Sequence, residues 1–520
     1  MRYIIPENRF QLQTNFGCLD DVIEANNIVR VIDFFIDELD IKSLGFNRSE
    51  PHTKGRKPYN PKDLLKLYIY GYLNRINSSR KLEQETKRNL EVKWLLGNLS
   101  PDFKTIADFR KDNRDQMKNV FKEFSYICRS AKLIDFQLTA IDGSFFSAVN
   151  HNSKNFSKNK IKKLMKKLDD NIEQYLAEIN RTDQHDFSQI SDLQEQLKKL
   201  QQKKKEYHTL QENLNKSGEK QFSTTDPDSR MMVKAGSKTD VSYNVQSVVD
   251  SKHNLLVEYD VTNDSNDMKQ LARMSEKVKT TYGLESLRVT ADKGYSAGDE
   301  LAKCRRMNVE TFTPFQTLRN GKRNGIFTSD HFSYDSSEDC DTCPIGRKLP
   351  RLSRDNYHKQ TFYGSAETCR GCNHLSECAS SKLNYRKLYR SDFSEIVEAQ
   401  KERNRHNKDK LDARKTMVEH PFGTIKHHMK FTGFLTRRLP SVNGEFGLVA
   451  LCYNLKRVFS ILGFDGLMAA IQRYYSILRS DRFQESLFLL IFSSPFCVFS
   501  TFKNAKYRFY RISRLIYYGL

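Results

Sequence analysis

Two apolar runs that carry a carboxylate at or near their end constrain the fold more than any other feature of the sequence. LTAIDGS at 138–144 contains Asp142, and SLRVTAD at 286–292 ends at Asp292. Short apolar runs of this kind predict buried strands. Because carboxylates at strand ends of an α/β sheet commonly point into a cleft, we expect both acids to lie at a site. Isolated buried negative charge is costly, so cations should compensate it there.

The segments around these runs predict a mixed α/β core. VSYNVQSVVD and LLVEYDVT resemble two strands of a hairpin, and VETFTPF resembles a final strand. Three strands followed by helix, strand, helix and strand is an unusual order for an α/β protein. The predicted elements are strands at 241–250, 255–262 and 286–292, with helices at 268–280 and 298–307.

The N-terminal region, residues 1–135, is predicted to be helical. One helix should follow the Asn60-Pro61 pair, and a second should run from Ser78 to Gly97. A third should begin with Ser100 as its cap and Pro101 in its first turn. Short helices with polar starts and flanking Lys and Arg suit a helix-turn-helix-like DNA-binding domain, and they suit an ordinary helical domain equally well.

Two insertions interrupt the predicted core. Apolar residues spaced three or four apart within about 157–216 predict an antiparallel helical hairpin. The hairpin would serve dimerisation, DNA contact or spacing, and intrachain packing is the role that we favour. The resulting domains are 1–135 (helical, DNA-binding), 136–315 (first part of the core, with the hairpin), 316–390 (Cys-rich), 391–480 (second part of the core and C-terminal helices) and 481–520 (unassigned).

The charge balance predicts a polyanionic partner. With 86 Lys+Arg against 64 Asp+Glu, the net charge is 86 − 64 = +22. Nucleic acid is the first candidate and an anionic membrane surface the second. The N-terminal segment has no secretory pattern, and the longest apolar stretch, 487–500, is too short to span a bilayer. We therefore expect a cytoplasmic protein that does not associate with a membrane.

Clustered cysteines predict a metal site and not a disulfide scaffold. Cys340 and Cys343 form one Cys-x₂-Cys pair, and Cys369 and Cys372 form another. Paired thiolates of this spacing can chelate one structural Zn²⁺, with free thiols as the alternative. Cys378 and His374 are further candidates for the fourth ligand. The isolated cysteines are expected in the core, at positions Cys18, Cys128, Cys304, Cys452 and Cys497.

A third acid, Glu419, lies in RKTMVEHPFGTIK among basic residues. Taken singly, Asp142 suits a turn cap and Glu419 a solvated helix position. Two or three such acids together supply the hard oxygen ligands that Mg²⁺ requires. Because Pro421 follows two residues later, we expect Glu419 near the start of a helix.

Six motifs in order resemble the core of bacterial insertion-sequence transposases of the DDE superfamily. They are AIDGSFF, DPDSRMMVKAG, YNVQSVVD, VTNDSNDMKQL, ADKGYS and VEHPFGTIK. The resemblance covers about residues 1–475 and implies an RNase H-like mixed sheet with Asp142, Asp292 and Glu419 as its catalytic triad. The family's Lys seven residues after the Glu is matched by Lys426. Its Arg four residues before is replaced by Lys415, beside Arg414, and its Tyr is missing.

The resemblance also implies a reaction and its partners. Two Mg²⁺ or Mn²⁺ ions held by the triad would support cleavage of a phosphodiester, and the freed 3′-OH would attack target DNA. Lys293, Arg414 and Lys426 would contact phosphate, or be solvated surface cations. The implied partners are double-stranded DNA, as terminal inverted repeats and target, and further copies of the chain on that DNA. The implied location is the bacterial cytoplasm, at the nucleoid.

Two other functions agree with the same residues. One is a DNA-binding protein descended from a transposase that has lost its chemistry, although all three acids are retained. The other is a metal-dependent nuclease that cuts without joining. Strand transfer with terminal inverted repeats would distinguish the three.

Overall fold

A computed structural model describes residues 17–50, 57–181, 187–233, 239–315, 327, 331–357, 359–378 and 384–492. The chain forms two compact units. The first unit contains residues 1–133, 146–243 and 423–520, and the second contains 134–145 and 244–422. Of the unassigned tail at 481–520, residues 493–520, with Cys497, lie outside the described residues.

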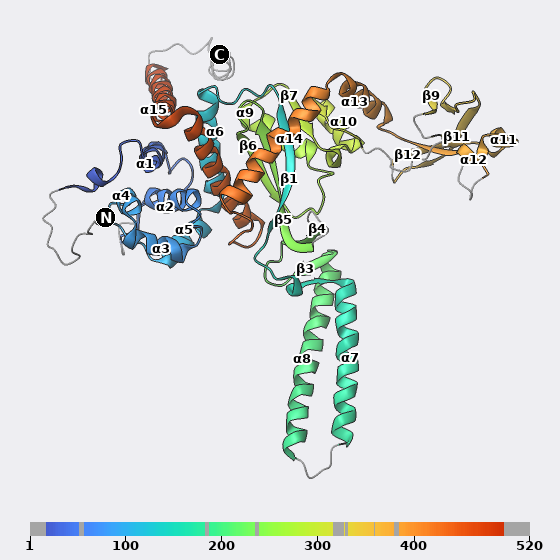
Figure 1. Cartoon of the computed structure of the whole chain (residues 1–520), viewed down its shortest axis with the longest axis horizontal. Helices are drawn as coiled ribbons and strands as arrows, with labels where there is room; N and C mark the ends of the chain where they lie inside the picture. Colours follow the sequence, from blue (N-terminus) through green and yellow to red (C-terminus); the bar gives the residue numbers. More distant parts are fainter. Residues whose placement is uncertain are drawn as a thin grey trace, which may run out of the picture. The chain divides into compact units, whose positions relative to one another are not determined.

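The first unit is built mainly from helices (Figure 1). The long helix α15 packs along α6 and also contacts α2 and α1. Asn60 caps α2 by accepting a hydrogen bond from the Lys62 N–H at 3.0 Å, and Pro61 occupies the first turn, as its sequence predicts. The helices are α1 (Ile28–Glu38), α2 (Pro61–Leu73), α3 (Ser79–Arg88), α4 (Leu90–Leu95), α5 (Phe103–Asp112), α6 (Arg114–Ser130) and α15 (Leu439–Phe492).

Two helix boundaries differ from the sequence prediction. The helix expected over 78–97 is divided at Asn89, whose side chain accepts from the Val92 N–H and starts α4. The helix expected to begin at Ser100 instead begins after Asp102, whose Oδ1 accepts from both Lys104 and Thr105 N–H groups at 2.9 Å. In both cases a side chain that satisfies free N–H groups of the first turn decides where the helix starts.

Helix α15 is unusually apolar. Its segment Leu439–Ser480 is, among the described residues, the one helix long and apolar enough to cross a membrane by length and composition alone. Within its most apolar window 61% of the residues are buried, however. A core helix passes the same test, and contacts with α6 and α2 account for the buried face. At Gly463 the backbone is non-helical, with φ 68°, so the helix bends there.

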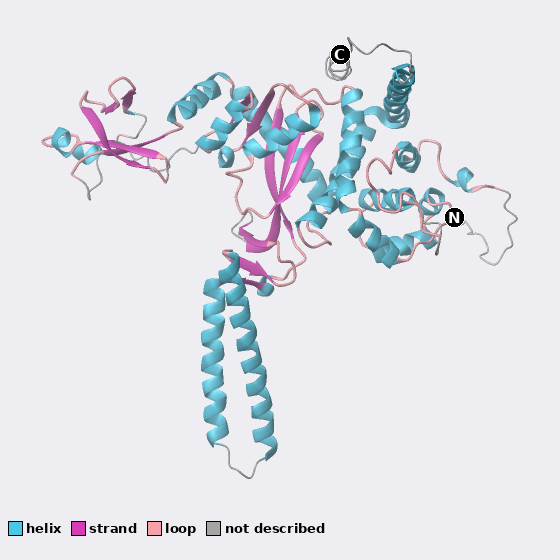
Figure 2. Ribbon diagram, turned by 180° about the vertical axis from the view of Figure 1, so that it is seen from behind, coloured by secondary structure: helices cyan, strands magenta, loops and turns pink. Residues whose placement is uncertain are grey.

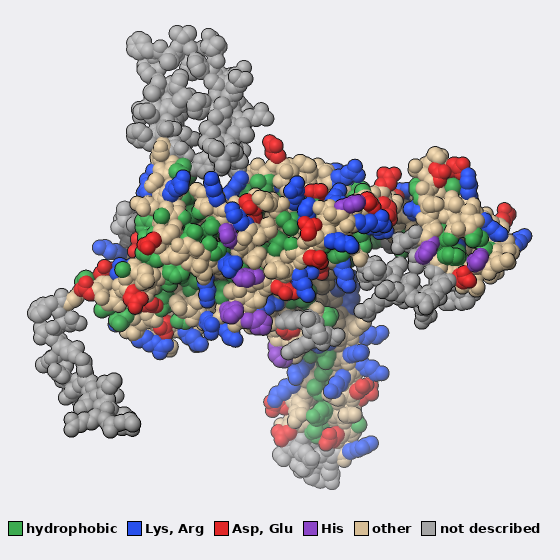
Figure 3. Space-filling view, turned by 45° about the horizontal axis from the view of Figure 1, so that its top comes forward, with side chains coloured by type: hydrophobic (Ala, Val, Ile, Leu, Met, Phe, Trp, Pro, Cys, Tyr) green, Lys and Arg blue, Asp and Glu red, His purple; other side chains and the backbone are tan. Residues whose placement is uncertain are grey.

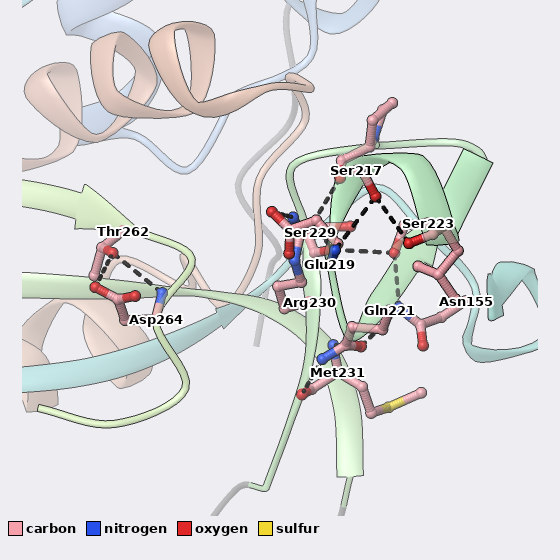
Figure 4. Close-up of polar contacts among 12 residues, drawn as sticks. Asn155, Ser217, Glu219, Gln221, Ser223, Ser229, Arg230, Met231, Thr262 and Asp264 are labelled. Atoms are coloured by element: carbon pink, nitrogen blue, oxygen red, sulfur yellow. Dashed lines mark hydrogen bonds and ion pairs between the residues drawn. The ribbon is translucent and has the colours of Figure 1, made fainter. Parts of the chain in front are cut away.

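The helical hairpin expected near 157–216 is formed by α7 (Lys158–Arg181) and α8 (Phe187–Ser217). Its base is tied by the short strands β2 (Asn155–Ser157) and β3 (Gln221–Ser223), which pair antiparallel. The Asn155 amide donates to Gln221 Oε1 at 3.0 Å and to Ser223 Oγ at 2.9 Å (Figure 4). Gln221 Oε1 also accepts from the Met231 N–H in β4 (Arg230–Val233) at 2.8 Å. These bonds join the hairpin base to the neighbouring strand.

The second unit contains most of a mixed sheet, whose strands Figure 2 shows in magenta. The sheet has the order β4-β5-β1-β7-β8, and β6 also pairs with β5. Strands β1, β7 and β8 run parallel, whereas β5 and β6 form the antiparallel hairpin that the sequence predicts. The strands are β1 (Thr139–Ser147), β5 (Thr239–Asp250), β6 (Leu256–Thr262), β7 (Leu287–Ala291) and β8 (Val309–Phe312). The first residues of β5, which pair with β4, belong to the first unit.

Helices and a second sheet complete the second unit. Helix α9 (Leu271–Tyr282) contacts β6 and β7, while α10 (Gly298–Arg306) and α13 (Ser394–His406) contact β8. Helix α14 (Lys408–Gly423) follows α13. The cysteine-bearing segment forms an antiparallel sheet in the order β13-β12-β11-β10-β9. Its elements are β9 (Ser333–Asp335), β10 (Cys340–Thr342), β11 (Lys348–Asp355), β12 (Gln360–Gly364), α11 (Ala366–Cys369), α12 (Leu375–Cys378) and β13 (Lys387–Ser391).

Candidate active site

Asp142 and Asp292 lie next to each other because of the register of two parallel strands. In that register Ile141 of β1 is the partner of Ala291 of β7. Asp142 and Asp292 each follow one member of this pair, so the two acids lie at the same level of the sheet. Strand β1 continues to Ser147, so Asp142 lies within its strand and not at the strand end that the sequence predicts. The sequence located the two strand positions, and the parallel pairing of β1 with β7 brings them together.

The environment of Asp142 disfavours its charged form. Burial raises the pKa of Asp142 to about 7, and the nearby charges of Asp292 and Asp267 raise it as well. The Arg414 guanidinium opposes this rise, since its Nη1 lies 4.0 Å from Asp142 Oδ1. Like charges close together in a low-dielectric setting resist ionisation. Burial is the largest cause, and it outweighs the opposing effect of the Arg414 cation on the pKa of Asp142.

Asp292 also shapes the turn that follows β7. Its Oδ1 accepts a hydrogen bond from the Gly294 N–H at 2.7 Å and caps the short helix Lys293–Tyr295. Lys293 is exposed on this turn. Tyr295 is buried, and its hydroxyl donates to Gln246 Oε1 at 2.6 Å. The Asp292 backbone is thereby fixed against strand β5.

Asp267 is a member of the acidic cluster that the sequence reasoning missed. Its Oδ1 accepts from Asn244 Nδ2 at 2.8 Å and from Gln246 Nε2 at 2.6 Å. Both amides belong to β5 and are buried. A signal was present in the sequence, because two amide side chains within an otherwise apolar strand need buried polar partners. The partner of both amides, Asp267, lies in VTNDSNDMKQL, directly after β6.

Gly143 is required by the close packing of this cluster. A Cβ at residue 143 would lie 2.4 Å from Gln246 Nε2 and 2.6 Å from Asp267 Oδ1. Both distances are shorter than a carbon atom tolerates. The glycine after Asp142 therefore lets β1 approach the polar side chains of β5 and the loop after β6.

Glu419 lies in the interior of α14, so the prediction that it lies near a helix start is wrong. The helix continues through Pro421, and the next turn widens into a π-helix over Thr424–His428. Met417 and Val418 pack against Ala140 of β1, whereas Glu419 itself is exposed.

The three predicted triad acids do not form a closed ligand set in this structure. Within the described residues, no group of three or more His, Cys, Asp or Glu side chains has the geometry to hold a metal ion. Asp292 and Asp267 are both close enough to Asp142 to raise its pKa, and Glu419 directly follows Val418, which packs against Ala140 of β1.

The predicted basic residues have different surroundings. Arg414 is directed at Asp142, as described above. Lys426 belongs to the first unit, where its ammonium lies 4.7 Å from the centre of the Phe146 ring. Lys and Arg side chains are spread over the visible face and not gathered in one patch (Figure 3). Their distribution alone does not identify a DNA-binding surface.

The cysteines of the second insertion have two different surroundings in the structure. Cys343, Cys369, Cys372 and Cys378 line a small cavity, together with His374. The Cys340 thiol is instead directed at Glu338 Oε2, 3.8 Å away. Of the isolated cysteines, Cys128, Cys304 and Cys452 are buried as expected, whereas Cys18 is exposed and so is not a core residue.

The fold and site define a mixed α/β protein with helical regions and two acids brought together by adjacent parallel strands. Residues 17–112 match the family model described as a transposase domain (DUF772), and residues 342–459 match the model described as a transposase DDE domain. These matches confirm the predicted resemblance: the chain is similar to DDE-type transposases, a family that generally uses divalent metal ions.

Other comparisons add little. A structure of the piggyBac transposase synaptic complex with hairpin DNA matches with 8% identity over 91% of this chain and 83% of that chain. Its TM-score is 0.30, which is too low to support an argument about this fold. No match was found among curated proteins.

Proposed function

We propose that the chain is a DNA transposase that binds transposon ends, cleaves a strand with the help of divalent metal ions and transfers the 3′-OH into target DNA. The two family matches indicate a DNA transposase, and the chemistry is our extension of them. The observation that carries it is the parallel register of β1 with β7, which sets Asp142, inside β1, beside Asp292, directly after β7. The strand order supports an RNase H-like core, with an antiparallel hairpin on one side and parallel strands on the other.

The carboxylate oxygens of the acidic cluster are the kind of donor that a hard divalent cation prefers. Asp142, Asp292 and Asp267 bring negative charge together where burial already raises the pKa of Asp142 to about 7. A cation would relieve this repulsion and let Asp142 ionise. Asp142 and Asp292, with Glu419 contributed by α14, would hold Mg²⁺ or Mn²⁺. When bound, such ions polarise the phosphodiester and lower the pKa of the attacking water or hydroxyl.

The chain's own residues have distinct roles in this proposal. Asp142 and Asp292 would supply carboxylate oxygens to the divalent ions. Asp267 orients the Asn244 and Gln246 amides beside Asp142. Arg414 is within 4.0 Å of Asp142, where a guanidinium can also donate to a phosphate oxygen. Lys293 and Lys426 are the further phosphate contacts.

The proposed partners follow from this reaction. Double-stranded DNA would be bound as terminal inverted repeats and as target, and the net charge of +22 favours such a polyanion. Handling of two transposon ends requires at least two copies of the chain on DNA. Accordingly, the proposed location is the bacterial cytoplasm, at the nucleoid.

A strand-transfer assay tests the proposal. Labelled terminal inverted repeats are incubated with a target plasmid, Mg²⁺ and either the native chain or Asp142→Asn. Joined products that depend on Asp142 and Asp292 support the transposase. Asp299→Asn is a matched control, because Asp299 is a half-exposed acid on α10 whose partner is Lys303. Nicking without joining would instead indicate a nuclease, and binding without nicking would indicate an inactive descendant.

A further inference from the structure

The small sheet of the second unit encloses a cavity bordered by four thiols. Cys343 follows β10, Cys369 ends α11, Cys372 lies in the loop after α11, and Cys378 ends α12. The cavity wall also includes apolar side chains such as Phe327, Leu349 and Leu375. Leu349 and Cys369 belong to the core of this sheet. Four thiols from three separate segments that border one cavity point to a shared ligand and not to packing alone.

The two loops that carry these thiols have the backbone form of metal-binding knuckles. The Arg347 N–H donates to Cys343 Sγ at 3.3 Å, and the Gly346 N–H donates to Cys343 O at 2.8 Å. Gly346 has φ +79° and Gly371 has φ +66°, conformations that glycine adopts without strain. An N–H directed at sulfur stabilises a thiolate, which is the form that binds metal.

Charge around the cavity also favours a bound cation with thiolate ligands. Cys378 lies near enough to Cys369, Cys343 and Cys372 for each of the three to interact with it electrostatically. Four thiolates cannot coexist here without a cation between them. A divalent ion with four thiolates has a net charge of about −2. Arg347 and Arg386 line the same cavity and offset that charge.

Cys340 does not belong to this group. Its thiol is directed at Glu338, and Cys340 is not among the residues that line the cavity. His374 also borders the cavity, and its Nδ1 lies 3.1 Å from Glu377 Oε2, which leaves its Nε2 as a competing ligand position. Cys378 interacts with all three other thiols, so we place it in the tetrahedral set, and a His374→Ala variant tests that choice.

We infer that Cys343, Cys369, Cys372 and Cys378 form a structural Zn²⁺ site that closes the small sheet, with Cys340 outside it. Tetrahedral sulfur coordination selects zinc among the available divalent ions, and it leaves no open position for catalysis. The side chains must turn inward from their present positions to reach Zn–S distances of about 2.3 Å. Each thiol loses its proton as the ion binds. This inference is independent of the proposed transposition chemistry.

Metal analysis of the full chain tests the ligand set. The native protein, purified without added metal, should contain about one zinc and no iron per chain by mass spectrometry. Cys378→Ser should lose most of the zinc, whereas Cys340→Ser and the exposed-thiol control Cys18→Ser should retain it. Zinc lost in Cys340→Ser but retained in Cys378→Ser would overturn the ligand set. Zinc lost in His374→Ala would overturn it as well, and iron or no metal in the native chain would overturn the zinc assignment.

A spectroscopic measurement covers the case in which Cys378→Ser does not fold. Replacement of zinc by Co²⁺ in the native chain should give the intense sulfur-to-metal absorption of a tetrahedral four-thiolate site. Cys378→His keeps a ligand at the position, so it should still bind Co²⁺ with weaker thiolate absorption. Absorption unchanged in Cys378→His, or no Co²⁺ uptake by the native chain, would contradict the inference.

Discussion

Tyr72 donates a hydrogen bond from its hydroxyl to Glu445 Oε1 at 2.9 Å, across 373 residues of sequence within the first unit. Glu445 is fully buried in α15. Its carboxylate also accepts from the Leu435 and Thr436 N–H groups, and the Arg110 Nη1 lies 3.8 Å away. One carboxylate thus joins α2, α5 and the loop before α15.

Removal of that carboxylate should be strongly destabilising. Glu445→Ala leaves the Arg110 charge without its counter-ion and two backbone N–H groups without an acceptor, so we expect a loss of roughly 3–5 kcal/mol in the free energy of unfolding. Tyr72→Phe removes a hydrogen bond to the charged carboxylate and an acceptor of the Arg110 guanidinium, so it should cost about 1.5–3 kcal/mol. Urea denaturation measures both, with the exposed Glu24→Ala as control. Equal effects for Glu445→Ala and Glu24→Ala would contradict the network.

Asp142→Asn should stabilise the metal-free protein in a pH-dependent way. Since burial raises the pKa of Asp142 from 3.8 to about 7 in the folded state, the folded protein binds more protons than the unfolded chain between these values. Stability contributed by this group is present below pH 4 and is lost as the pH rises through 7. Asp142→Asn avoids that loss, which amounts to on the order of 4 kcal/mol at pH 8.

Thermal melts from pH 4 to pH 8 in the presence of a chelator measure this effect. The difference in Tm between Asp142→Asn and the native chain should grow with pH, while Asp299→Asn should show no such growth. A difference that is constant over the whole pH range would refute the raised pKa.

Gly143→Ala should disrupt the acidic cluster. The added methyl group would overlap Gln246 Nε2 and Asp267 Oδ1, so we expect about 1–3 kcal/mol of destabilisation and loss of strand transfer. Gly423→Ala is the matched control, because Gly423 has helical angles and no atom within 4 Å of the added carbon. That substitution should be neutral or slightly stabilising. Similar Tm values for the two variants would show that the close approach is unimportant.

Arg414→Gln should shift the pH dependence of the reaction. Loss of the guanidinium 4.0 Å from Asp142 removes the cation that lowers the pKa of Asp142. The acidic limb of the rate profile should therefore move to higher pH. Lys415→Gln, at the exposed neighbouring position, should leave that limb in place. An unshifted limb in Arg414→Gln would mean that Asp142 is not the group that titrates.

The sequence determined most of the secondary structure in the core, because those signals are local. The strands carrying Asp142 and Asp292, the β5–β6 hairpin and the helical hairpin near 157–216 all follow from hydrophobic periodicity. Helix starts were less accurate: Asp102 replaces Ser100 as a cap because capping depends on which side chain meets the free N–H groups.

The tertiary structure alone decided which distant residues meet. The parallel register of β1 with β7 brings Asp142 beside Asp292, and the buried amides of β5 add Asp267 to them. Spacing suggested Cys340 as a metal ligand, whereas the fold turns its thiol toward Glu338 and places Cys378 with the other cysteines. Sequence patterns report periodicity and local capping. Contacts between segments depend on strand order and packing, which no local pattern encodes.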